Sequence, residues 1–134
     1  MAFKLWKGRA HIEWYPKLAS TAYTNGDLVH LVAGGLTVAD ATSVDHVGVI
    51  QQTFTTSDTT TAEAPVLVPH DETVWEVEFA DTLTSSMIGQ FHTLTDGNTV
   101  NAAATNPEQV CVVGVVNSTL GLVKINEQAN YSST

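Results

Sequence analysis

Short runs in which apolar and polar residues alternate recur along the chain, separated by turn-forming residues. The clearest is 74–79, where Trp75, Val77 and Phe79 occupy every second position. Because successive side chains of a strand point to opposite faces, this run predicts a strand with one core face. No stretch of ten or more residues keeps a helical period. We therefore expect short strands at 3–6, 10–15, 28–32, 47–55, 64–68, 74–79, 90–94, 109–116 and 120–125.

Turn residues divide the chain in the same way. The pairs at 25–26, 34–35 and 96–97 contain glycine and predict tight turns. The segment 84–88, followed by Gly89, has hydroxyl residues before two apolar ones and predicts a single helical turn closed by glycine. It is the only helical element that we expect.

The run 109–116 differs from the alternating strands. From Val110 to Val116 it is apolar at every position except Gly114, which favours a strand covered on both faces. The second cover could be the rest of the domain or a neighbouring subunit. Cys111 lies within this run and is expected to be a small buried hydrophobic residue. The candidate residues for an oligomer interface are Val112, Val113, Val115 and Val116.

Composition supports an all-β domain. The 134 residues include 19 Thr and 17 Val, whose branched side chains fit a pleated sheet better than a helix. The length suits one domain that needs no disulfide or metal, and the lone cysteine can form no internal disulfide and fits a reducing compartment. The Thr-rich segment 53–63 carries few core residues and predicts an exposed loop.

Charge is unevenly distributed. The net charge is −9, yet residues 1–17 hold four of the five basic residues and one acidic residue, which makes this segment +3 and the rest −12. We therefore divide the chain into a basic, aromatic segment at 1–17, a single β domain at 18–126 and a polar tail at 127–134. The first segment is either an anchoring arm or a first strand with lysines on its solvent face. Its candidate partner-binding residues are Phe3, Lys4, Leu5, Trp6, Lys7 and Arg9.

Several functions are disfavoured by the sequence. An acidic chain lacks the clustered Lys and Arg that drive nucleic-acid binding, and no apolar run is long enough to span a bilayer. The five histidines lack recognised ligand spacing, so we expect no metal site. No nucleophile motif or phosphate-binding glycine loop is present, so we expect no enzyme activity and no cofactor.

Motifs along nearly the whole chain, residues 3–126, resemble a known family. In the first half they are FKLWKG at 3–8, GDLV at 26–29 and HVGVI at 46–50, before the Thr-rich loop. In the second half they are VLVP at 66–69, the Trp75 strand, MIG at 87–89, LTDG at 94–97, VNAAAT at 100–105, VVG at 112–114 and VKI at 123–125. These segments resemble the head decoration, or cement, proteins of tailed bacteriophages.

The resemblance implies a small β-barrel or β-tulip-like domain of short antiparallel strands. Its members bind the outside of the expanded capsid, commonly as trimers, and stabilise it against internal DNA pressure. The implied partners are the major capsid protein and further copies of the chain, on the outer surface of a virion whose head assembles in the host cytoplasm. Phe3, Leu5 and Trp6 would then be the apolar anchors, and Lys4, Lys7 and Arg9 would steer the approach.

Two other functions stay open. One is a carbohydrate-binding or adhesive β-module in which Trp14, Tyr15 and Tyr23 form a sugar platform. The other is a trimeric β-rich nucleotide hydrolase, which would need a phosphate-binding segment that we do not find in the sequence. Assays of glycan binding, of metal-dependent nucleotide hydrolysis and of binding to phage heads would distinguish these two functions from that of a decoration protein.

Overall fold

The fold is almost entirely strands. The computed structural model describes residues 3–126, and the tail expected at 127–134 lies outside that range. The described residues form eleven strands and one short 3-10 turn. In chain order these are β1 (Lys4–Lys7), β2 (Ala10–Pro16), β3 (Leu28–Val32), β4 (Gly35–Val38), β5 (His46–Ile50), β6 (Glu63–Pro69), β7 (Val74–Phe79), η1 (Ser85–Met87), β8 (Phe91–Asp96), β9 (Thr99–Asn101), β10 (Val110–Asn117) and β11 (Leu120–Ile125).

Five strands close a small barrel. Its order is β7-β11-β10-β8-β9, and β9 pairs back to β7. All these neighbours are antiparallel except β7 and β9, which run parallel where Glu78 faces Thr99 and Phe79 faces Val100. The expected small all-β barrel is confirmed, and the parallel closure is its one departure from an antiparallel order.

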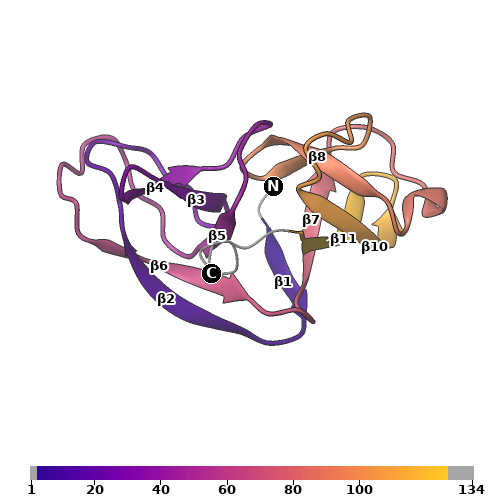
Figure 1. Ribbon diagram of the computed structural model, residues 1–134, viewed down its shortest axis with the longest axis horizontal. Coiled ribbons are helices and arrows are strands. Elements are labelled where there is room, and N and C mark those ends of the chain that lie inside the picture. The colour runs from indigo at the N-terminus through magenta and orange to yellow at the C-terminus, as the bar shows by residue number, and fades with distance from the viewer. Residues whose placement is uncertain (1–2, 127–134) are drawn as a thin grey trace.

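A second, open sheet lies beside the barrel. Its order is β2-β6-β5-β3-β4, and every pairing in it is antiparallel. Figure 1 shows this sheet at one end of the elongated molecule and the barrel at the other, with β1 between them. Since β1 pairs with β7 and β2 pairs with β6, residues 4–16 belong to both sheets.

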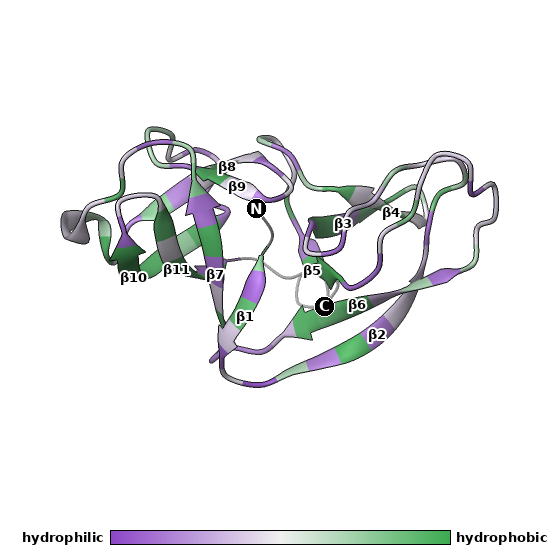
Figure 2. Cartoon of the chain, turned by 180° about the vertical axis from the view of Figure 1, so that it is seen from behind, coloured by the Kyte–Doolittle hydropathy of each residue, from purple (hydrophilic) through white to green (hydrophobic). Residues whose placement is uncertain are grey.

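The hydrophobic core has two parts. The barrel is filled by Trp75, Val77 and Phe79 from β7, as the alternation predicts, together with inward residues of the other strands. A second cluster around Tyr23 and Val66 lies against the open sheet. Figure 2 shows the hydrophobic residues concentrated on the strands of both sheets.

The strand covered on both faces is β5, not β10. All five β5 residues are buried; Val49 packs into the barrel cluster, while Val47 and Ile50 pack into the second cluster. In β10, by contrast, only Val110 and Val112 are fully buried. The mostly apolar run at 110–116 therefore does not have a second cover within the described chain.

Most turn predictions are confirmed, and the boundaries differ at a few elements. The helical turn is η1, and Gly89 after it has φ +93°, a conformation that glycine adopts at little cost. The strand expected at 47–55 ends at Ile50, because the chain there enters the loop. Two short strands, β4 and β9, were not expected from the pattern.

The Thr-rich segment 53–63 is a mostly exposed loop, as expected, but it is held at its base. The ring of Phe54 packs edge-on against Tyr23. Lys17 is 1% exposed, and its Nζ donates to the carbonyl of Thr60 at 2.6 Å and lies 3.5 Å from Asp58 Oδ1. Lys17 thus anchors this loop and does not belong to an exposed basic surface.

Candidate interaction surface

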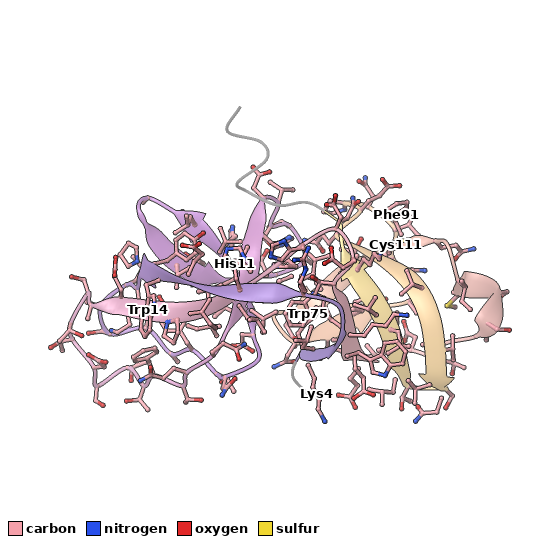
Figure 3. All side chains as sticks on the ribbon, turned by 90° about the horizontal axis from the view of Figure 1, so that it is seen from below. Lys4, His11, Trp14, Trp75, Phe91 and Cys111 are labelled. Carbon is pink, nitrogen blue, oxygen red and sulfur yellow. The ribbon has the colours of Figure 1, made fainter. Side chains whose placement is uncertain are left out.

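The N-terminal candidate residues divide between core and surface. Phe3 is 3% exposed, packs in the barrel cluster and donates its backbone N–H to Gly26 at 2.8 Å. It is therefore a core residue and not a partner-binding anchor. Lys4 and Leu5 line a hollow beside Leu67 and Trp75, and Figure 3 shows the Lys4 side chain directed away from the body.

Trp6 and Lys7 lie on the outer wall of the barrel. The pairing of β1 with β7 shifts register between Leu5 and Lys7, and the Trp6 side chain is left 50% exposed. Lys7 Nζ stacks over the Trp6 ring, 5.4 Å from its centroid. Cation–π contact of this kind stabilises the exposed indole modestly, so Trp6 and Lys7 form one unit on the surface.

Arg9 is exposed but already has an anionic partner. Its Nε lies 3.2 Å from Oε2 of Glu72, in the turn before β7. The pKa of Glu72 is lowered by a hydrogen bond from a backbone N–H and by the Arg9 guanidinium. A partner that binds Arg9 must compete with this carboxylate, which is a weak surface pair.

Two β-bulges determine which valines of β10 reach the surface. Register shifts occur between Val112 and Gly114, and again between Val115 and Asn117. Each bulge inserts one extra residue and reverses the inward–outward alternation. Val112 is fully buried and Val115 is partly buried against the barrel core, whereas Val113 and Val116 are 37% and 49% exposed. Of the four proposed interface valines, only Val113 and Val116 lie on the outer surface.

The N-terminal candidate residues and the candidate valines of β10 meet at one place on the surface. Trp6 and Lys7 from β1 and Val113 from β10 line the same hollow, of about 490 Å³, on the outside of the barrel. We call this the barrel-wall hollow; its remaining lining residues are Glu72, Val74, Leu122 and Lys124. These four were not singled out in the sequence, although the alternation of 120–125 places Leu122 and Lys124 on one face.

The barrel-wall hollow is apolar at its centre and charged at its rim. Trp6, Val113 and Leu122 supply the apolar surface, and Lys7, Lys124 and Glu72 supply charges of both signs. An exposed aromatic residue beside aliphatic ones, inside a charged rim, is typical of protein-binding surfaces. The arrangement is suited to burying a side chain of a protein partner.

The aromatic platform considered for carbohydrate binding is not formed. Tyr23 is 1% exposed, and its hydroxyl donates to the carbonyl of Leu36 at 2.6 Å and accepts from the N–H of Leu18 at 2.9 Å. Trp14 is 56% exposed, but Tyr15 is its neighbour on β2 and so points to the opposite face. Trp14 therefore stands without the two tyrosines on its face of the sheet.

Two histidines are buried in separate places. His46 is 1% exposed, and its Nε2 lies 2.8 Å from Ser43 Oγ. Burial, with a smaller contribution from His30, lowers the pKa of His46 to about 4. His92 is 2% exposed and packs against the ring of Phe79. Both rings are therefore buried in the fold, and neither lines the barrel-wall hollow.

Cys111 is half-buried, not fully buried as expected, and burial raises the pKa of its thiol. It lines a hollow with Phe91, and both are labelled in Figure 3. Among residues 3–126, no group of three or more His, Cys, Asp or Glu side chains is arranged to hold a metal ion. Over the same residues, no helix is long and apolar enough to cross a membrane.

Comparisons with known proteins do not assign the chain to a family. No protein-family model matches the chain, and no curated protein matches it.

Proposed function

We propose that this protein decorates the outer surface of a tailed-phage head, where it binds the major capsid protein and stabilises the expanded shell against internal DNA pressure. The proposal assigns it to the virion, after head assembly in the host cytoplasm. Its role would be structural, without catalysis, cofactor or nucleic-acid binding. The motif resemblance along residues 3–126 suggests this function, and the all-β barrel is compatible with it.

The barrel-wall hollow is the observation that carries the proposal. Trp6 is half-exposed on an edge strand, beside Val113 and Leu122 and under the Lys7 ammonium. Tryptophan contributes a disproportionate share of the binding energy in protein interfaces. Apolar residues gathered around an exposed indole and bordered by charged residues are the pattern that favours this hollow as a binding surface. The partner would insert an apolar side chain between β1 and β10.

Co-sedimentation with expanded heads tests the proposal. The heads come from the phage that carries this chain's gene and lack their own copy of the protein. Wild-type protein should pellet with them, and Trp6→Ala should weaken binding by about 30-fold, which corresponds to the hot-spot threshold of about 2 kcal/mol. Circular dichroism of each variant checks that the fold is intact.

Trp14→Ala is the matched control. Trp14 is exposed to a similar degree, 56% against 50% for Trp6, but lies on β2 of the other sheet. It should bind heads like the wild type. Equal loss in both variants, or loss only in Trp14→Ala, would contradict the assignment to the barrel-wall hollow. Failure of the wild-type protein to pellet with heads would contradict the function itself, and a glycan array would then test the carbohydrate-binding alternative.

We also propose that the protein acts as a homotrimer whose subunits meet through the outer face of β10 around Val116. Val116 lies on the solvent side of the β10–β11 hairpin and does not line the barrel-wall hollow, so a neighbouring copy could cover it while the hollow stays open to the shell. Sedimentation velocity at micromolar concentration should give a trimer, and Val116→Asp should shift the distribution towards monomer. A wild-type monomer under these conditions would contradict a preassembled trimer.

A further inference from the structure

Strand pairing brings together two histidines that are 59 residues apart in the chain. His11 on β2 lies opposite Val68 of β6, so His70, two residues further on, is its diagonal neighbour. The two imidazoles are in contact: His11 Nδ1 lies 3.0 Å from His70 Nε2. Both residues are exposed at the surface, and Figure 3 shows His11 on the outer strand of the sheet.

A carboxylate fixes the orientation of the first ring. Glu13 is two residues after His11 on β2 and therefore on the same face, and its Oε2 lies 2.9 Å from His11 Nε2. An ionised carboxylate can only accept hydrogen bonds. The proton of the neutral His11 ring is therefore held at Nε2, and the lone pair of Nδ1 faces His70.

This arrangement has the parts of a metal site. In protein metal sites a ligating histidine commonly donates its other N–H to a carboxylate, which orients the ring and raises its basicity. Two nitrogens bound to one divalent ion at about 2.0–2.1 Å lie about 3.0–3.4 Å apart, and the separation here is 3.0 Å. Both side chains are exposed and can turn until the two lone pairs point at the same ion.

The local charge also suits a cation. Glu13 contacts His11, Asp71 follows His70 in the chain, and the Glu72 carboxylate interacts electrostatically with His70. The opposing charges nearby are Arg9, which is paired with Glu72, and Lys124, which lines a hollow with His70 and Asp71. The surroundings of the two imidazoles therefore carry more negative than positive charge.

We propose that His11 and His70 bind a divalent transition-metal ion of the zinc type, with Glu13 orienting His11 and water completing the coordination. The sequence predicts no such site, because one ligand lies on β2 and the other directly after β6, and only the β2–β6 register brings them together. The ion would link β2 to the β6–β7 turn. Because the ligands are far apart in sequence, it would bind the folded chain and raise its melting temperature. The inference is independent of the capsid proposal.

Zinc titration of tag-free, metal-stripped protein tests the site. Calorimetry should show one Zn²⁺ per chain, and the melting temperature should rise with Zn²⁺ concentration. Cu²⁺ should bind more tightly than Zn²⁺, following the usual order for nitrogen ligands. Mg²⁺, which prefers oxygen ligands, should leave both readouts unchanged. Long-range ¹H–¹⁵N spectra of the wild-type imidazoles should shift at His11 Nδ1 and His70 Nε2.

Three variants and a control assign the ligands. His11→Asn and His70→Asn should each weaken Zn²⁺ binding at least tenfold, and Glu13→Gln, which keeps both imidazoles, should weaken it by about tenfold. His30→Asn removes a histidine from outside the site and should bind like the wild type. The proposal is overturned if millimolar Zn²⁺ gives neither heat nor imidazole shifts, or if Zn²⁺ binding survives unchanged in both His11→Asn and His70→Asn.

Discussion

His46 illustrates at the scale of one residue how burial controls a titratable group. It lies in a polar cluster with Ser43, whose carbonyl accepts a hydrogen bond from the amide of the buried Gln109 at 2.6 Å. The Gln109 side chain also accepts from the Leu94 N–H at 2.6 Å. The cluster thus ties the loop before β5 to the barrel, and its burial favours the neutral form of the His46 ring.

We therefore expect the free energy of unfolding to decrease as the pH is lowered, because of the protonation of His46. Its folded-state pKa of about 4 is below the unfolded value of 6.5, so the unfolded chain binds the proton more tightly. The contribution of the neutral ring is complete above pH 6.5 and is lost as the pH falls towards 4, a change of about 3 kcal/mol. The lowered pKa of His30, caused mainly by burial, acts in the same direction.

Urea denaturation at pH 7.5, 6 and 4.5 measures this effect. His46→Gln keeps a hydrogen-bonding side chain beside Ser43 but cannot titrate, so its free energy of unfolding should depend less steeply on pH than that of the wild type. Identical pH dependence in the two proteins would show that His46 does not carry the effect.

At the scale of the element, β1 is a structural strand as well as the carrier of Trp6. Phe3, directly before it, fills the barrel cluster, so Phe3→Ala should destabilise the fold by about 3–5 kcal/mol. Leu5→Ala, at a side chain that is 40% exposed, is the control and should cost much less. Chemical denaturation compares them. Equal stability of Phe3→Ala and wild type would mean that residues before β1 are a detachable arm.

The β10–β11 hairpin permits a second comparison, between two glycines. A Cβ at Gly121 would lie 2.6 Å from the Phe79 ring and 2.7 Å from Leu83, inside the barrel, whereas at Gly114 it would meet only the end of Leu122 at 3.0 Å. Gly121→Ala should therefore cost about 1–3 kcal/mol by overpacking, and Gly114→Ala should cost less. Thermal denaturation of both variants checks the order, and the reverse order would contradict this placement of the hairpin.

These elements show which features a sequence pattern can predict. The alternation at 74–79 predicts the inward face of β7, because each apolar position has a polar or exposed neighbour. The run at 109–116 is apolar almost throughout, so it carries no sign of the two bulges that place Val113 outside and Val112 inside. Strands as short as β4 and β9 leave too few residues to show a period.

The barrel-wall hollow could not be predicted, because the hydrophobic pattern of the sequence does not show which distant strands pair. Trp6 and Val113 are far apart in sequence and share a hollow only because β1 joins the barrel sheet at β7. Sequence reasoning identified Trp6 as a partner-binding candidate from its residue type and the local charge, and Val113 as an interface candidate from the apolar run around it. It could not identify Phe3 and Lys17 as buried, because their burial is set by the packing of distant segments.

At the scale of the whole molecule, the two sheets offer different surfaces to a partner. The barrel end carries the barrel-wall hollow with Trp6, and the open-sheet end carries the exposed loop 53–63, anchored by Lys17. If the protein decorates heads through the hollow, the barrel wall faces the shell or a neighbouring subunit. The open sheet and the loop then project away from the head.

An image reconstruction of expanded heads carrying this protein tests that account most directly. The account predicts added density on the outer surface of the shell. The structure should fit this density with β1, β10 and β11 against a protein neighbour and with the loop 53–63 exposed. Density in which the open sheet or that loop makes the contact, or heads that acquire no density at saturating protein concentration, would contradict it.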